Sequence, residues 1–241
     1  MRISVIIPAF NEERLLPETL RHVNTALDEF TKRQWQTEVI VCNNNSTDRT
    51  AELALQAGAK VIFEPINQIG RARNRGASAA SGDWLIFVDA DCKPSAELFA
   101  EVASQMEQGN CLAGGSTVKL DGNFPLGRWL IGLWNLVSRT GRWMAGSFIF
   151  CEASAFRTIG GFSEDLFVAE ELALAKRFKQ LAREQNKRIV ILRTHPLVTS
   201  GRKFHLYSFR EHLSLFVWTL LRPGKVLNSR EGSHMWYDGR R

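Results

Sequence analysis

Short, continuously apolar runs alternate with longer segments of helical apolar spacing along the first 110 residues. The runs lack the in-and-out alternation of half-exposed strands, so they predict strands buried on both faces. The predicted strands are 3–7, 38–42, 60–63 and 84–88, and the predicted helices are 14–30, a segment from about 49, 70–80 and 95–108. A β-α repeat of this kind predicts an α/β fold with a mostly parallel central sheet and helices on both faces.

The second half of the chain is less regular. Further strands are expected at 112–118, 147–151 and 188–192, further helices at 169–182 and 206–221, and an apolar stretch at 125–138 has no assigned element. No repeat, low-complexity stretch or linker interrupts the chain. We therefore expect a single domain over 1–200, with 201–241 forming an amphipathic helix and tail that pack on it.

The composition limits the kinds of molecule that the chain is expected to bind. The chain has 31 Lys and Arg against 25 Asp and Glu, a formal net charge of +6, which favours anionic ligands or an anionic membrane face. The basic residues do not alternate with aromatic ones along a stripe, so nucleic acid is not an expected partner. The four cysteines show no metal-binding spacing and are expected to be buried, reduced thiols.

The N-terminal segment predicts a location inside the cell. MRISVIIPAF has neither the long apolar region nor the cleavage site of a signal peptide, and no stretch reaches about 18 apolar residues. We expect a cytoplasmic protein, with a peripheral position at the inner face of the membrane as the other expectation.

The strongest chemical signal is Asp89-Ala90-Asp91, directly after the fourth predicted strand. Carboxylates at a strand end need a compensating charge, and a divalent cation supplies it. Mg²⁺ or Mn²⁺ prefers such oxygen ligands together with substrate phosphates. The alternative is that Asp91 only caps the next helix.

Three further groups of polar residues accompany this motif. Polar loops follow the first and second strands and could read a base and a ribose, although Asn and Asp also favour plain turns. Arginines open the helix at 70, where anions such as a diphosphate are favoured, although a solvated basic face has the same appearance. An acidic cluster holds the candidate general base, or only the usual acidic bias of a first helical turn. The residues are Pro8 to Glu12, Asn43 to Asp48, Arg71, Arg73, Arg75, Glu164, Asp165, Glu170 and Glu171.

These motifs together resemble the family-2 glycosyltransferases of the GT-A, Rossmann-like fold. The matching stretches are SVIIPAFNEE, EVIVCNNNSTDRTAELA, GRARNRGASAASGDWLIFVDAD and GGFSEDLFVAEELAL, in the family's order between residues 4 and 174. The resemblance implies a metal-dependent, inverting transfer of a sugar from a UDP- or GDP-linked donor to an acceptor hydroxyl. The acceptor, which could be a saccharide, a lipid or a small molecule, is left open.

The resemblance also implies roles for individual residues. The implied donor-binding residues are Pro8, Ala9, Glu12, Asn43, Asn44, Arg73, Asn74, Asp89 and Ala90, and the implied metal ligands are Asp89 and Asp91. Glu171 is the expected catalytic base and Glu170 the second choice. Two departures stand out: Asn43-Asn44 replaces the family's usual Asp-Asp pair, and Glu171 replaces an aspartate.

Two competing functions and one open question remain. A nucleotidyltransferase would need a basic Gly-rich signature near the first strand, and PAFNEE has none. A catalytically silent nucleotide-sugar binder is the other alternative, favoured by the Asn-Asn change. Trp129, Trp134 and Trp143, which lie among arginines, suit core packing, an acceptor platform or a membrane surface.

Overall fold

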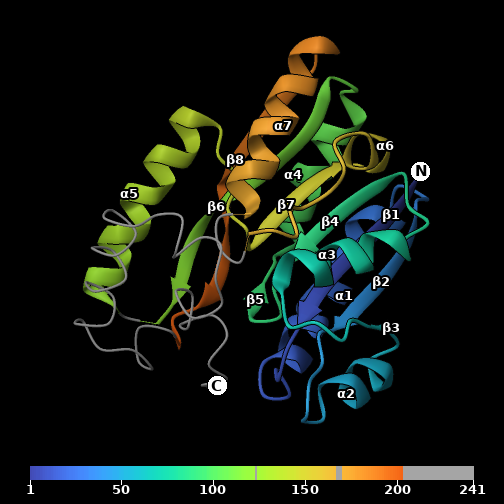
Figure 1. Cartoon of the computed structure of the whole chain (residues 1–241). Coiled ribbons are helices and arrows are strands. Elements are labelled where there is room, and N and C mark those ends of the chain that lie inside the picture. Colours follow the sequence, from blue (N-terminus) through green and yellow to red (C-terminus); the bar gives the residue numbers. More distant parts are fainter. Residues whose placement is uncertain (123, 167–169, 203–241) are drawn as a thin grey trace.

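One sheet organises the part of the chain that the computed structural model describes, namely residues 1–122, 124–166 and 170–202 (Figure 1). Its eight described strands lie in the order β3-β2-β1-β4-β7-β6-β8-β5. The strands are β1 (Arg2–Ala9), β2 (Gln36–Asn43), β3 (Lys60–Phe63), β4 (Trp84–Val88), β5 (Cys92–Lys93), β6 (Cys111–Asp121), β7 (Phe148–Glu152) and β8 (Arg188–Ser200).

The four strands expected in the first half are confirmed as a parallel group. β1 pairs in parallel with both β2 and β4, and β2 pairs in parallel with β3. All five residues of β4 are buried, as are seven of the eight residues of β1. Both faces of these strands are therefore covered, which explains why their sequences are continuously apolar.

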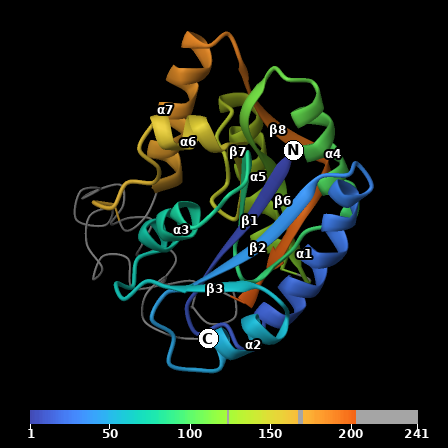
Figure 2. The same ribbon diagram turned by 90° about the vertical axis from the view of Figure 1, so that its right-hand side faces the viewer.

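Helices cover both faces of the sheet, as expected (Figure 2). One apolar core packs helices α1 and α4 against one face, and a second packs α3, α6 and α7 against the other. The helices are α1 (Leu16–Thr31), α2 (Thr50–Gln56), α3 (Ile69–Ser78), α4 (Ala96–Glu107), α5 (Pro125–Gly141), α6 (Ala153–Thr158) and α7 (Glu170–Glu184).

The second half makes the sheet mixed rather than purely parallel. β7 is antiparallel to both β4 and β6, whereas β6 and β8 pair in parallel. β8 extends eight residues beyond its predicted end at 192 and pairs with β5, which the sequence did not predict. Only Leu197 of the extension is buried, and its sequence RTHPLVTS is neither continuously apolar nor regularly alternating, so it gave no strand signal.

The sequence patterns gave a wrong prediction at one helix start and no prediction for two helices. The polar loop before α2 favours Ser46 or Thr47 as the cap of this helix, but neither caps it, and Asp48 instead accepts hydrogen bonds from the backbone and hydroxyl of Thr50. The unassigned stretch at 125–138 is helix α5, and helix α6 was not predicted.

The cysteines match the expectation. All four cysteines are free and buried, and burial raises the pKa of both Cys42 and Cys111 to about 12. Among the described helices, none combines the length and apolarity that crossing a bilayer requires. The expected helix at 206–221 and the tail to 241 lie outside the described residues.

Candidate active site

The candidate active site lies at one edge of the sheet, where the parallel strands end. β1 ends at Ala9, β2 at Asn43, and β4 is followed directly by the Asp89-Ala90-Asp91 loop. The carboxyl ends of parallel strands share one edge, so these segments meet although they are far apart in the sequence. Pro8 and Ala9 are buried at this edge and shape its floor.

Hydrogen bonds from three separate segments to its backbone hold the acidic loop. The Asp89 amide donates to the carbonyl of Ser147 at 3.2 Å, and the Asp91 carbonyl accepts from the amide of Ser200 at 3.1 Å. The Ala90 carbonyl accepts from the Thr19 hydroxyl at 2.8 Å. The Asp89 and Asp91 side chains stay accessible, at 28% and 16% exposure. These hydrogen bonds fix the path of the loop backbone, while both carboxylates face solvent in part.

Arg73 is buried at the centre of the acidic residues, with 1% exposure. Its guanidinium donates to Glu170 at 2.6 Å, to Asp89 at 2.8 Å and to the Gly146 carbonyl at 2.8 Å. Burial opposes its charge most strongly, yet nearby carboxylates raise the pKa of Arg73 above its usual range. Arg73 therefore links the acidic loop after β4 to the first turn of α7 as a permanent cation.

The two glutamates that open α7 have different environments. Glu170 is 4% exposed and paired with Arg73. Burial, followed by the charge of Glu171, raises the pKa of Glu170 to about 8, despite the opposing charge of Arg73. Glu171 is partly exposed, and within the described residues its carboxylate forms no hydrogen bond or ion pair. A side chain added at Gly146 would lie 3.4 Å from Arg73 and 3.5 Å from Glu171, so both flank this glycine.

Asn74 holds the segment that leads toward these glutamates. Its side chain accepts from the Phe162 amide at 2.8 Å and donates to the Phe162 carbonyl at 3.0 Å. Gln68 donates to the carbonyls of Glu164 and Leu166 in the same segment. The start of α3 was expected to contact a nucleotide. In the structure, the side-chain amides of Gln68 and Asn74 instead bind backbone groups of the loop before α7 and anchor it.

The two asparagines after β2 also have partners within the chain. The Asn43 side chain accepts from the Ser46 amide at 2.9 Å and shapes the turn. Asn44 is 4% exposed, donates to the carbonyls of Glu64 and Ile66, and accepts from the Gln68 amide. The donor side of this amide faces two carbonyl oxygens, a geometry that an ionised aspartate could not satisfy.

Arg202 is a site residue that the sequence analysis missed. Its guanidinium donates to both carboxylate oxygens of Glu12, at 2.9 and 2.7 Å, and lies 3.6 Å from Asp91. The signal was hidden because β8 was predicted to end at 192, too early to carry Arg202 to this edge. Glu12, expected to contact the donor, is buried and holds this arginine.

Two carboxylates form the candidate cation site. No cluster of three or more His, Cys, Asp or Glu side chains suited to a metal occurs among the described residues. Mg²⁺ is usually held by one or two carboxylates with substrate phosphates and water completing the shell, and Asp89 and Asp91 fit that mode. The ring of His195 on β8 pairs with Glu101 on α4, rather than with either of these two aspartates.

Sequence comparisons find relatives that share part of this chain. It is 34% identical over 113 residues to a TPR repeat-containing protein of Synechococcus elongatus and 31% over 142 to a dolichol-phosphate mannosyltransferase of Pyrococcus furiosus. It is 38% identical over 110 residues to a 4,4'-diaponeurosporenoate glycosyltransferase of Staphylococcus haemolyticus. These matches cover 46%, 54% and 43% of this chain but only 26%, 38% and 28% of the respective relatives.

Solved structures share the fold over nearly the whole chain. S. aureus TarS residues 1–349 in complex with UDP-GlcNAc align with a TM-score of 0.66 at 21% identity, covering 98% of this chain and 69% of TarS. Glucosyl-3-phosphoglycerate synthase from Mycobacterium tuberculosis, in complex with Mn²⁺, UDP and phosphoglyceric acid, aligns with a TM-score of 0.62 at 18% identity, covering 91% and 77%.

The family model for glycosyl transferase family 2 matches residues 4–167, which is more than half of the chain and includes the strand ends and the acidic loop. The sheet order, the position of the acidic loop and this match agree with one another. The chain therefore belongs to glycosyltransferase family 2 and has the GT-A fold.

Proposed function

We propose that this chain transfers a sugar from a nucleotide-diphosphate donor to an acceptor hydroxyl, with inversion at the anomeric carbon. One observation carries the proposal: Arg73 joins the acidic loop after β4 to the first turn of α7, where the Glu171 carboxylate forms no hydrogen bond or ion pair with the described residues. The residues proposed to bind the diphosphate and the carboxylate proposed to accept the proton thus lie at the same edge, which supports the proposal. Membership of the family supports the reaction class.

Asp89 and Asp91 are the residues proposed to hold a divalent cation, Mg²⁺ or Mn²⁺. When bound, such an ion would neutralise the diphosphate as its negative charge grows. Both carboxylates are partly exposed and belong to a loop fixed by backbone hydrogen bonds. The glucosyl-3-phosphoglycerate synthase structure holds Mn²⁺ and UDP, which supports this proposal.

The donor is proposed to be UDP- or GDP-linked and to lie along the ends of β1, β2 and β4. Pro8, Ala9 and Asn43 line this edge, while Asn44 and Asn74 shape it through their contacts with backbone groups. Arg202, beside Asp91, adds a cation near the proposed diphosphate position. The TarS complex with UDP-GlcNAc supports a uridine nucleotide, although the Asn-Asn pair leaves the base open.

Glu171 is proposed to act as the general base. It takes the proton from the acceptor hydroxyl as that oxygen forms a bond to the anomeric carbon. The bond from this carbon to the phosphate oxygen breaks on the opposite face, and its electron pair leaves with the nucleoside diphosphate. Glu170 is unsuited to this step, because it is buried and bonded to Arg73.

A lipid-linked acceptor is the class that we favour. The names of two relatives specify dolichol phosphate and diaponeurosporenoate. Both molecules are lipids, and they support the lipid class only, because the transfer proposed above needs an acceptor that carries a hydroxyl. An acceptor of this kind would require the enzyme to work at a membrane surface. Saccharide acceptors are the comparison set in any activity test.

The decisive test of the base is a pair of neighbouring variants. Glu171→Gln is expected to lower turnover by about 10²- to 10⁴-fold, the usual contribution of general-base catalysis, with donor binding unchanged. Glu170→Gln is the matched control and should retain most of the activity. Near-normal turnover of Glu171→Gln with a large loss in Glu170→Gln would transfer the role to Glu170.

Donor and cation binding can be tested without turnover. The melting temperature should rise with the correct UDP-, GDP- or dTDP-sugar and rise further with Mn²⁺, because ligands that bind only the folded state stabilise it. Asp91→Asn should abolish the Mn²⁺-dependent part, whereas Asp83→Asn, at the opposite end of β4, should leave it intact. Binding with no transfer or donor hydrolysis would favour a silent binder, and pyrophosphate release a nucleotidyltransferase.

A further inference from the structure

Helix α5 carries a row of large apolar side chains exposed to solvent. Five of the nine exposed large hydrophobic residues in the described chain lie on this one helix: Trp129 at 65%, Leu130 at 41%, Leu133 at 49%, Leu136 at 56% and Val137 at 43% exposure. Their spacing places them on a single helical face. We call this row the α5 ridge.

The opposite face of α5 attaches the helix to the sheet. Asn135 accepts from the Val118 amide and donates to the Val118 carbonyl, both at 2.9 Å, and the buried Ser138 donates to the Trp143 carbonyl. The helix is therefore anchored through one side, which leaves the ridge on the other. An exposed apolar face of this kind marks an interaction surface.

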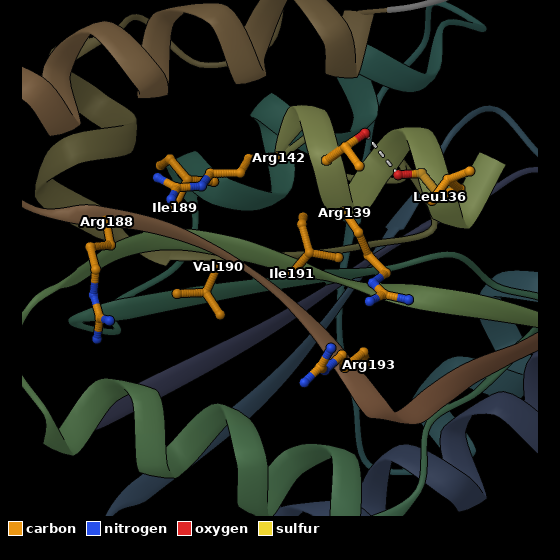
Figure 3. Close-up of a pocket in the computed structure, with 9 residues that line it drawn as sticks. Leu136, Arg139, Arg142, Arg188, Ile189, Val190, Ile191 and Arg193 are labelled. Carbon is orange, nitrogen blue, oxygen red and sulfur yellow. Dashed lines mark hydrogen bonds between the residues drawn. The ribbon is translucent and has the colours of Figure 1, made fainter. Parts of the chain in front are cut away.

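A basic groove of about 400 Å³ lies between the C-terminal half of α5 and the first half of β8 (Figure 3). Arg139 and Arg142 line it from the α5 side, and Arg188 and Arg193 line it from β8. We call these four residues the arginine groove. Leu136 belongs to both the ridge and the groove lining, so the two features are continuous.

The charge of the arginine groove is not neutralised within the described chain. No aspartate or glutamate lines it, and no acidic side chain pairs with Arg139, Arg142 or Arg193 in the described ranges. Within the described residues, the Arg188 guanidinium donates to the side-chain amide oxygens of Gln108 and Asn110. A neighbouring hollow of about 230 Å³ adds Lys179 and Arg183 from the α7 side, whereas Lys187 in its lining is paired with Glu152.

We propose that the α5 ridge and the arginine groove together dock the protein on a bilayer that carries anionic phospholipids. Tryptophan and leucine on one helical face suit insertion at the boundary between headgroups and acyl chains. Guanidinium groups bind phosphate through paired hydrogen bonds, and basic residues near the surface are attracted by its negative potential. The proposal goes beyond the transfer reaction, because it concerns binding and involves none of the proposed site residues.

Charge decides between a membrane and a second copy of the chain. Two copies meeting symmetrically through their α5 ridges would bring two arginine grooves together, and like charges at an interface are unfavourable. An anionic bilayer instead offers an apolar interior for the ridge and phosphates for the groove. Both features then have a partner in a single surface.

The test is flotation of the full chain with vesicles of phosphatidylcholine alone or with about 30% phosphatidylglycerol. We expect binding to the anionic vesicles, weakening as salt increases. The double variant Arg139→Glu/Arg193→Glu should lower partitioning at least tenfold, since each cation near such a surface adds roughly fivefold. Trp129→Gln/Leu133→Gln should lower it by a similar factor.

Matched controls lie elsewhere on the molecule. Leu55→Gln replaces an equally exposed leucine on α2, and Arg21→Glu replaces an exposed arginine on α1. Both should stay within twofold of the unmodified chain. Each of three results would overturn the proposal: equal binding to both vesicle types, equal loss in the controls, or a concentration-dependent dimer that the ridge variants abolish. Nucleotide-sugar thermal shifts should persist in every variant, so failure here is distinguishable from failure of the transferase proposal.

Discussion

At the carboxyl ends of β1 and β4, charged side chains are paired inside the chain, whereas the arginines between α5 and β8 have no acidic partner among the described residues. Arg73 contacts two carboxylates and Arg202 contacts two others. Arg139 and Arg193 contact none within the described ranges. Removing a buried, paired charge destabilises the folded state, whereas an exposed, unpaired charge is available to an external partner.

The largest loss of stability is expected when Arg73 is replaced. Arg73→Ala leaves the buried Glu170 without its hydrogen-bond donor and Asp89 without its cation, and the loss of one partner of such a buried contact costs about 3–5 kcal/mol of unfolding free energy. Urea unfolding followed by tryptophan fluorescence measures the change. Arg75→Ala, two residues later on the same helix, removes an exposed guanidinium and should cost about 0.5 kcal/mol or less. Equal stability of the two variants would remove the distinction between paired and surface charge.

The pH dependence of stability provides a second test of the paired region. The pKa of Glu170 rises from 4.5 to about 8 on folding, so the folded state favours the protonated carboxyl. Its contribution to stability is complete below about pH 4.5 and declines as the pH rises through about 8. Glu170→Gln should therefore show a smaller loss of melting temperature between pH 6 and 9 than the unmodified chain. Parallel pH profiles for the two proteins would show that Glu170 titrates normally.

Asn44 tests whether the departure from the family's aspartate is structural. Asn44→Ala removes three hydrogen bonds to the segment 64–68 and should cost about 2–3 kcal/mol, because buried backbone groups lose their partners. Asn44→Asp should cost at least as much at pH 7, and less near pH 4, where a protonated carboxyl can donate. Asn67→Ala, which breaks one exposed hydrogen bond, is the control. If the Asn44→Asp protein were as stable as the unmodified chain at pH 7, the Asn44 side-chain nitrogen would not be the group that faces the carbonyls of Glu64 and Ile66.

The smallest effect is expected on the α5 ridge. Leu133→Gln changes a side chain that is 49% exposed, so the unfolding free energy should stay within about 0.5 kcal/mol of the unmodified chain. Leu20→Ala in the core, at 1% exposure, should cost about 2–5 kcal/mol in the same assay. A loss above about 1.5 kcal/mol for Leu133→Gln would mean that another part of the chain covers the ridge.

The sequence by itself determined the parallel half of the fold. Continuous apolar runs and helical periodicity are local properties, so the strands at 3–7 and 84–88 could be located from them. The acidic motif could be placed at a strand end for the same reason. The sequence did not determine the structure of the apolar stretch at 125–138. Apolar residues at helical spacing do not distinguish a buried helix from one whose apolar face is exposed, as in α5.

Only the tertiary structure decided the environments of the site residues. It separated Glu170, buried against Arg73, from Glu171, which is adjacent in the sequence and identical in type. It also carried Arg202 across 190 positions of sequence to Glu12 by extending β8 to Ser200. Burial and charge pairing arise from contacts between segments that are distant in the chain, and no local pattern of residues encodes them.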